Sequence, residues 1–133
     1  MMYNELTRLH FETAAHAGEL SVGPARRDAT ATLRRGTAGQ RATGTWVQFD
    51  VRIESRGGVQ SVADARFLAF GCPHVVAIAD WLAAQAVGRA AVPELPESVH
   101  ALARRFAVPV AKLGRLLVVE DAWNAAFSTP NRR

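Results

Sequence analysis

The segment Asp64-Ala65-Arg66-Phe67-Leu68-Ala69-Phe70-Gly71-Cys72-Pro73-His74 joins a strand pattern to the start of a helix. It contains the only cysteine of the 133-residue chain. Proline is favoured at the first position of a helix, because its missing N–H group has no helical partner there. Pro73 therefore predicts a helix that begins directly after Cys72, with Cys72 as its N-cap.

The predicted position of Cys72 favours its thiolate form. The positive end of a helix dipole stabilises negative charge, and the thiolate is the form that attacks sulfur or binds a metal. His74 follows two residues later and is expected to supply a second donor atom or a positive charge. An enzyme with Cys72 as nucleophile and His74 as base is disfavoured, since residues two apart lie about 200° apart around a helix.

The composition predicts one soluble domain over residues 1–133. Apolar residues make up 49% and charged residues 21% of the chain, which is ordinary for a globular protein. No apolar run approaches the roughly 18 residues that a membrane span requires, and the first residues lack the layout of a signal peptide. We therefore expect a cytoplasmic protein. A single cysteine excludes an internal disulfide and a cysteine-only metal site within one chain.

The chain is basic, with a net charge of +4, and Lys112 is the only lysine among its sixteen basic residues. Binding to nucleic acid would require basic residues clustered on one face. The arginine pairs are instead scattered, at 26–27, 34–35, 104–105 and 132–133. RNA binding thus stays a minor alternative, and an acidic protein partner is an equally good use for these charges.

Two strands are predicted directly before Cys72. Residues 45–54 alternate between apolar and polar, with Val47, Phe49, Val51 and Ile53 on one face, as in a half-buried antiparallel strand. A turn over 55–58 then leads into a returning strand over 59–70. Residues 18–45 are rich in Gly, Ala, Thr and Arg and predict a long loop, with a strand somewhere within 29–36 or 37–43.

Four helices are expected from the spacing of apolar residues. They cover residues 3–16, 73–88, 96–106 and 108 to about 127, and Gly18 and Gly88 follow the first two as stops. In the last helix one buried stripe is drawn by Leu113, Leu116, Val119, Trp123 and Phe127. Residues 128–133 are expected to form a frayed tail.

The segment Asp64-Ala-Arg-Phe…Phe-Gly-Cys72 resembles the sequence around the central cysteine of the IscU/NifU N-terminal family of iron–sulfur cluster scaffolds. The hairpin and the Pro109-Val-x-Lys-Leu…Val-Glu-Asp-Ala-Trp pattern of the last helix follow in the family's order. Residues 40–127 match well, and residues 3–16, with the pair His10-Phe11, match weakly. The resemblance implies an α+β sandwich, in which an antiparallel sheet of about three strands is covered on one face by helices.

The same resemblance implies a site of three cysteines, of which only Cys72 remains. The family's first cysteine and its aspartate would fall at Thr43 and Thr45, and its His-Cys pair at Gly114 and Arg115. A positive charge at position 115 opposes the binding of cations. It would stabilise a thiolate or a persulfide on Cys72 if the fold brings the two side chains together, and the helical spacing points Arg115 away from the core stripe.

The resemblance implies a role in iron–sulfur cluster assembly, not an enzyme. Cys72, helped by His74, would be the sole remaining ligand for a transient [2Fe–2S] cluster, iron or zinc, in one chain or across a homodimer, or it would accept sulfur as a persulfide. A cysteine desulfurase or another assembly protein is the implied partner. The alternative is a metal-free, protein-binding accessory of iron–sulfur assembly in which Cys72 is structural.

Overall fold

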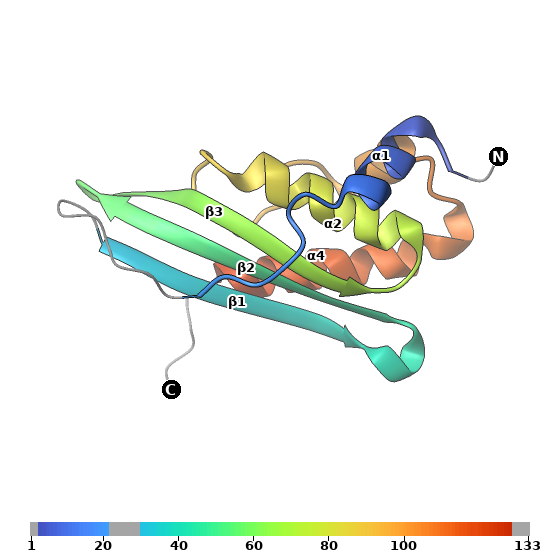
Figure 1. Ribbon diagram of the computed structural model, residues 1–133, viewed down its shortest axis with the longest axis horizontal. Coiled ribbons are helices and arrows are strands. Elements are labelled where there is room, and N and C mark those ends of the chain that lie inside the picture. The colour runs from blue at the N-terminus through green and yellow to red at the C-terminus, as the bar shows by residue number, and fades with distance from the viewer. Residues whose placement is uncertain (1–2, 22–29, 129–133) are drawn as a thin grey trace.

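The computed structural model describes residues 3–21 and 30–128, which form a three-stranded antiparallel sheet with helices packed against one of its faces (Figure 1). The strands lie in the order β1-β2-β3. The predicted α+β fold is confirmed. The elements in chain order are α1 (Glu5–Thr13), β1 (Thr30–Gln40), η1 (Arg41–Thr43), β2 (Thr45–Arg56), β3 (Val59–Phe70), α2 (Pro73–Ala86), α3 (Val99–Arg105), η2 (Val110–Lys112) and α4 (Leu113–Phe127).

The predicted hairpin is confirmed as β2 and β3. Its two-residue turn is Gly57-Gly58, with φ of 61° and 82°, and the favoured two-residue hairpin turn requires positive φ at both positions. Phe49 pairs with Phe67 across the hairpin. The apolar face of β2 is buried under the helices, with Val47, Phe49 and Val51 fully enclosed.

The strand expected within residues 29–36 or 37–43 is present and spans both ranges, so the expectation of a long loop over residues 18–45 is wrong for this part. Residues 30–40 form one continuous strand that pairs along β2, and residues 22–29 lie outside the described part of the chain. β1 lacks a clear apolar alternation because α4 lies directly on it. Gly36 is buried, and a Cβ atom there would be 2.1 Å from the backbone nitrogen of Ala126. The strand therefore buries small residues at positions where a recognisable strand pattern would have large apolar residues.

The helices are confirmed in type but are shorter than predicted. α1 is capped at its start by Asn4, whose side chain accepts a hydrogen bond from the Thr7 N–H, and at its end by Ala14 in the left-handed conformation. The segment before α4 is a 3-10 turn over Val110–Lys112. The predicted stripe of α4 is confirmed, with Leu116, Val119, Trp123 and Phe127 buried and Leu113 partly buried. Of the predicted tail, 129–133 lie outside the described residues.

α2 is the central helix of the covered face, and a buried aspartate ties the N-terminal helix to it. Asp80 is 2% exposed and accepts hydrogen bonds from His10 Nδ1 at 2.6 Å and from the His16 backbone N–H at 2.8 Å. The chain between these contacts turns at Ala14. α1 is thereby held against α2, in front of the residues that follow Cys72.

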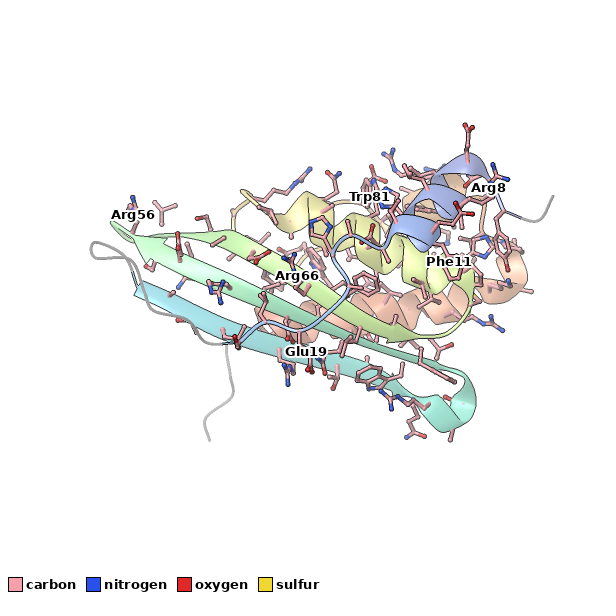
Figure 2. All side chains as sticks on the ribbon, viewed as in Figure 1. Arg8, Phe11, Glu19, Arg56, Arg66 and Trp81 are labelled. Atoms are coloured by element: carbon pink, nitrogen blue, oxygen red, sulfur yellow. The ribbon has the colours of Figure 1, made fainter. Side chains whose placement is uncertain are left out.

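Residues 16–21 form a strap across the face of the sheet that the helices leave open; Glu19 and Arg66 are labelled on this face in Figure 2. The Gly18 N–H donates to the carbonyl of Phe67 at 2.8 Å, and the Leu20 N–H donates to Asp50 Oδ2 at 2.9 Å. Arg35 pairs with both oxygens of Asp50, which is fully buried. The polar face of β2 is thus partly covered as well. No helix in the described ranges combines the length and apolar character needed to cross a bilayer.

Candidate functional site at Cys72

Cys72 lies at the corner where β3 ends and α2 begins. It is the N-cap of α2, with φ of −76° and ψ of 166°, and Pro73 occupies the first turn, as predicted. Its carbonyl accepts hydrogen bonds from the N–H groups of Val75 at 3.0 Å and Val76 at 3.2 Å. The thiol is partly buried and forms no capping hydrogen bond through its sulfur. The sulfur therefore does not cap the helix, although it lies beside the N–H groups of the helix start.

The surroundings of Cys72 favour the thiolate. Burial raises the pKa of the thiol, but the Val75 N–H, the Arg115 side chain, the His74 N–H and Lys112 together hold that pKa below its ordinary value. The sulfur lacks capping geometry, so the backbone N–H groups stabilise its negative charge as the positive end of the helix dipole. Arg115 is thus one of the groups that lower the pKa of Cys72, and its role at the site stays a prediction. A thiolate is the more reactive form towards sulfur.

His74 lies under Tyr3 and not at the surface. It is 1% exposed, and its ring packs edge-on against Tyr3 with centroids 4.8 Å apart. Neither ring nitrogen has a hydrogen-bond partner within the described chain. Burial, with Lys112 and Arg115, lowers the pKa of His74. The lowered pKa disfavours the positive charge that the sequence suggested, and the use of His74 as a second donor stays a prediction.

The other positions singled out in the sequence line the same end of the fold. Thr43 ends the 3-10 turn between β1 and β2, is exposed, and donates to the carbonyl of Gln40 at 2.9 Å. Thr45 begins β2 and is 7% exposed. A Cβ atom at Gly71 would lie 3.6 Å from the Gly44 carbonyl, so the β1–β2 turn borders the cysteine corner. Gly114 and Arg115 are exposed in the first turn of α4.

The donors at this corner do not fit a resident cluster or metal ion. Iron–sulfur clusters and zinc are held by several thiolates, with imidazole as the usual substitute. Among the residues that the structure describes, no group of three or more His, Cys, Asp and Glu could hold a metal ion. Thr43 and Gly114 offer no soft ligand, and Arg115 and Lys112 oppose a cation. One chain therefore provides a reactive thiol without a ligand set.

Sequence reasoning missed two contributors, Tyr3 and Lys112. Lys112 Nζ lies 5.7 Å from the centre of the Tyr3 ring, and Tyr3 in turn covers His74. Lys112 was visible as the only lysine, but its approach to Cys72 depends on the 3-10 turn that ends at this residue. Tyr3 gives no local signal, because its contacts come from segments about 70 and 110 residues further along the chain.

Large apolar side chains are exposed on the elements that meet at the corner. Phe70 at the end of β3 is 50% exposed, Val110 before α4 is 83% exposed and Leu117 in α4 is 52% exposed. The guanidinium of Arg41 lies 4.7 Å from the centre of the Trp46 ring at the start of β2. Exposed apolar residues near basic groups are typical of surfaces that contact another protein.

Comparison with known proteins agrees with the fold and identifies the family. The fold is similar to the crystal structure of a protein assigned as an iron–sulfur cluster assembly scaffold for the SUF system of thermophilic Fervidobacterium islandicum AW-1, with a TM-score of 0.61 and 12% identity, over 96% of this chain and 98% of that chain. At this identity the likeness supports the fold alone. No curated protein sequence matches the chain. The family model of the NifU-like N-terminal domain, however, matches residues 2–128, and the protein therefore belongs to this family.

Proposed function

We propose that this protein acts in iron–sulfur cluster assembly as a scaffold-type protein whose Cys72 accepts sulfur as a persulfide. Its membership of the NifU-like N-terminal domain family supports the process, and the similar SUF protein is itself assigned as an assembly scaffold. The observation that carries the finer proposal is the thiol with a lowered pKa beside Arg115, in a chain whose described residues lack a metal-ligand set.

The chemistry needs a protein that carries a cysteine persulfide, such as a cysteine desulfurase. The Cys72 thiolate attacks the outer sulfur of that persulfide, the donor's S–S bond breaks, and a new S–S bond forms on Cys72. The donor leaves as its thiolate, so electrons and atoms balance without an added oxidant. Arg115 and Lys112 stabilise the negative charge before the transfer, on the thiolate, and after it, on the outer sulfur of the product.

A second role has its own support. Cargo iron, zinc or a [2Fe–2S] cluster could be held between two copies of the chain, each giving Cys72, because membership of the scaffold family favours such cargo. The cationic side chains at the corner argue against it. His74 could join only if Tyr3 moved, since the imidazole is 1% exposed. A metal-free binding module with a structural Cys72 is the third candidate, and the lowered pKa argues against a purely structural thiol.

The partner in this proposal is a cysteine desulfurase or another assembly protein that docks over the corner. The exposed Phe70, Val110 and Leu117 would provide apolar contacts, and Arg41 and Arg115 would meet acidic groups. In this role the protein is a carrier and not an enzyme. It would work in the cytoplasm, where free thiols persist.

Sulfur transfer can be tested by intact-mass measurement after incubation with a cysteine desulfurase and free cysteine. We expect the protein to gain the mass of one sulfur atom, a gain that disappears with reductant and is absent in Cys72→Ser. Arg115→Gln should slow the gain, whereas Gly114→Ala, one residue away and with open space around the added Cβ atom, should not. Absence of any sulfur on Cys72 would overturn the proposal.

A parallel measurement separates the alternatives. The protein and Cys72→Ser are purified and reconstituted with iron and sulfide without oxygen. Stoichiometric iron and sulfide that vanish in Cys72→Ser would favour cluster cargo shared between chains. If neither sulfur nor iron is found on the wild-type protein, the metal-free binding module is the remaining reading.

A further inference from the structure

A second candidate site lies at the other end of α2 from Cys72. A cavity of about 320 Å³ opens between the end of α2, the residues 89–96 that follow it, and the C-terminal half of α4. Figure 1 shows α2 running away from the cysteine corner towards this end. The volume is at the lower limit of the roughly 300–1,000 Å³ typical of small-molecule sites, so it fits a small metabolite and not a nucleotide cofactor.

The inner wall of this cavity, called the α4 cavity below, is apolar. It is lined by Val62, Ala86, Leu95, Trp123 and Phe127. Four of these side chains are nearly enclosed, with exposed fractions of 2% for Val62 and Ala86, 3% for Trp123 and 6% for Phe127. Such a wall favours the apolar body of a ligand over water.

Hydrogen bonds on both sides hold the cavity open without a ligand. The Gly88 N–H donates to the Val62 carbonyl, and the Val62 N–H donates to the Arg89 carbonyl, both at 2.9 Å. The Trp123 indole N–H donates to the Glu94 carbonyl at 3.2 Å. The loop is thereby fixed to β3 at one end and to α4 at the other. A ligand would enter a preformed site, which lowers the entropy cost of binding.

The mouth of the α4 cavity carries one cationic and one anionic side chain. Arg89 and Glu94 both line it and both are exposed, next to Val92, which is 46% exposed. One Arg89 N–H donates to Gln85 Oε1 at 3.2 Å, which uses one of the five donors of a guanidinium. An apolar chamber with opposite charges at its opening matches a molecule that has an apolar body and both charges on its head.

We propose that the α4 cavity binds a free α-amino acid with an apolar side chain. The side chain would fill the chamber against Trp123, the carboxylate would pair with Arg89, and the ammonium group would pair with Glu94. If the cavity instead held an apolar side chain of a partner protein, that side chain would use only the chamber and not the two charged residues. The site is separate from Cys72 and does not depend on the function proposed there.

The test uses leucine, together with 4-methylpentanoate, which lacks the ammonium group, and 3-methylbutylamine, which lacks the carboxylate. Binding is followed in the ¹⁵N-labelled protein through the indole N–H signal of Trp123, assigned by its loss in Trp123→Phe. We expect saturable shifts with leucine in the millimolar range. Each analogue should bind about tenfold more weakly, because one charged hydrogen-bonding partner is lost.

Variants at the mouth sharpen the test. Arg89→Gln should weaken the binding of leucine and 4-methylpentanoate without affecting that of 3-methylbutylamine. Glu94→Gln should weaken the binding of leucine and 3-methylbutylamine without affecting that of 4-methylpentanoate. Val92→Trp should block the chamber to all three probes, and Arg8→Gln, on the exposed side of α1 (Figure 2), should change nothing. Cys72→Ser should bind leucine like the wild-type protein. The proposal is overturned if leucine causes no saturable shift, if the three probes bind equally, or if Arg89→Gln has no effect on leucine.

Discussion

Gly36→Ala and Gly114→Ala each add one methyl group, and they should change the stability of the protein in opposite directions. Gly36 lies in β1 beneath α4, where a Cβ atom would be 2.1 Å from Ala126 N, 2.5 Å from Ala122 O and 2.7 Å from Ala125 C. All three are backbone atoms, which cannot rotate away as a side chain can. Gly36→Ala therefore forces α4 off the sheet and loosens the packing around Trp123 and Phe127.

The magnitude follows from the rigidity of that contact. Overpacking a core costs about 1–3 kcal/mol and sometimes more, and here the neighbour that must yield is a whole helix. The smaller conformational freedom of the unfolded alanine chain returns only about 0.4–1 kcal/mol. We expect Gly36→Ala to lower the free energy of unfolding by about 3 kcal/mol, a large share of the roughly 5–15 kcal/mol of a typical domain.

Gly114→Ala is the matched control, because it makes the same chemical change in open space. No atom lies within 4 Å of its added Cβ, and the residue is helical. Alanine exceeds glycine in helix propensity by about 1 kcal/mol in a helix interior, and about half of that is expected in this first turn. Both variants are measured by urea unfolding at constant m-value. A Gly36→Ala variant within about 0.5 kcal/mol of the wild type, the range of ordinary surface changes, would refute the packing argument.

Four further perturbations test the site and its supports. Arg115→Gln should raise the pKa of Cys72, so the pH midpoint of its alkylation by iodoacetamide should move upward. An unchanged midpoint would show that Arg115 does not act on the thiol. Because the folded pKa of Cys72 is lowered, its unfolded state binds more protons between the two pKa values, so the wild type should gain stability over Cys72→Ser as pH rises through that window. His74→Phe should leave the free energy of unfolding unchanged or raise it by about 1–3 kcal/mol, since it removes two buried nitrogens without partners. A lower free energy of unfolding in urea would mean that the imidazole has a hydrogen-bond partner. Asp80→Ala should cost about 2–4 kcal/mol by releasing α1, whereas Asp121→Asn on the exposed side of α4 should change unfolding little.

The parts of the fold that were predictable are those with local causes. The alternation of Val47, Phe49 and Val51 predicts β2, and the Gly57-Gly58 turn predicts its return. Pro73 predicts both the start of α2 and the capping position of Cys72. These features depend on residues that are close in sequence, and the structure confirms them.

The parts that were missed depend on contacts between distant segments. The full length of β1 could not be predicted, because Gly36 must be small to fit beneath α4, about 90 residues later. The burial of His74 depends on Tyr3, from the other end of the domain. The alternation along β2 puts Asp50 on the polar face, yet this residue is enclosed because the strap and Arg35 both bind it. The approach of Arg115 to Cys72 was expected only by combining helical spacing with a family resemblance.

The Cys72 corner is best understood through the sign of the charge that it stabilises. A helix N-terminus, Arg115 and Lys112 all lower the energy of a negative charge on the sulfur, and all raise the energy of a bound cation. A site that held iron would need additional anionic ligands to outweigh them, and Thr43 and Gly114 carry none. A persulfide needs no such ligands, because its charge has the sign that the corner already favours. In the function proposed here, Arg115 therefore favours carrying sulfur over holding metal.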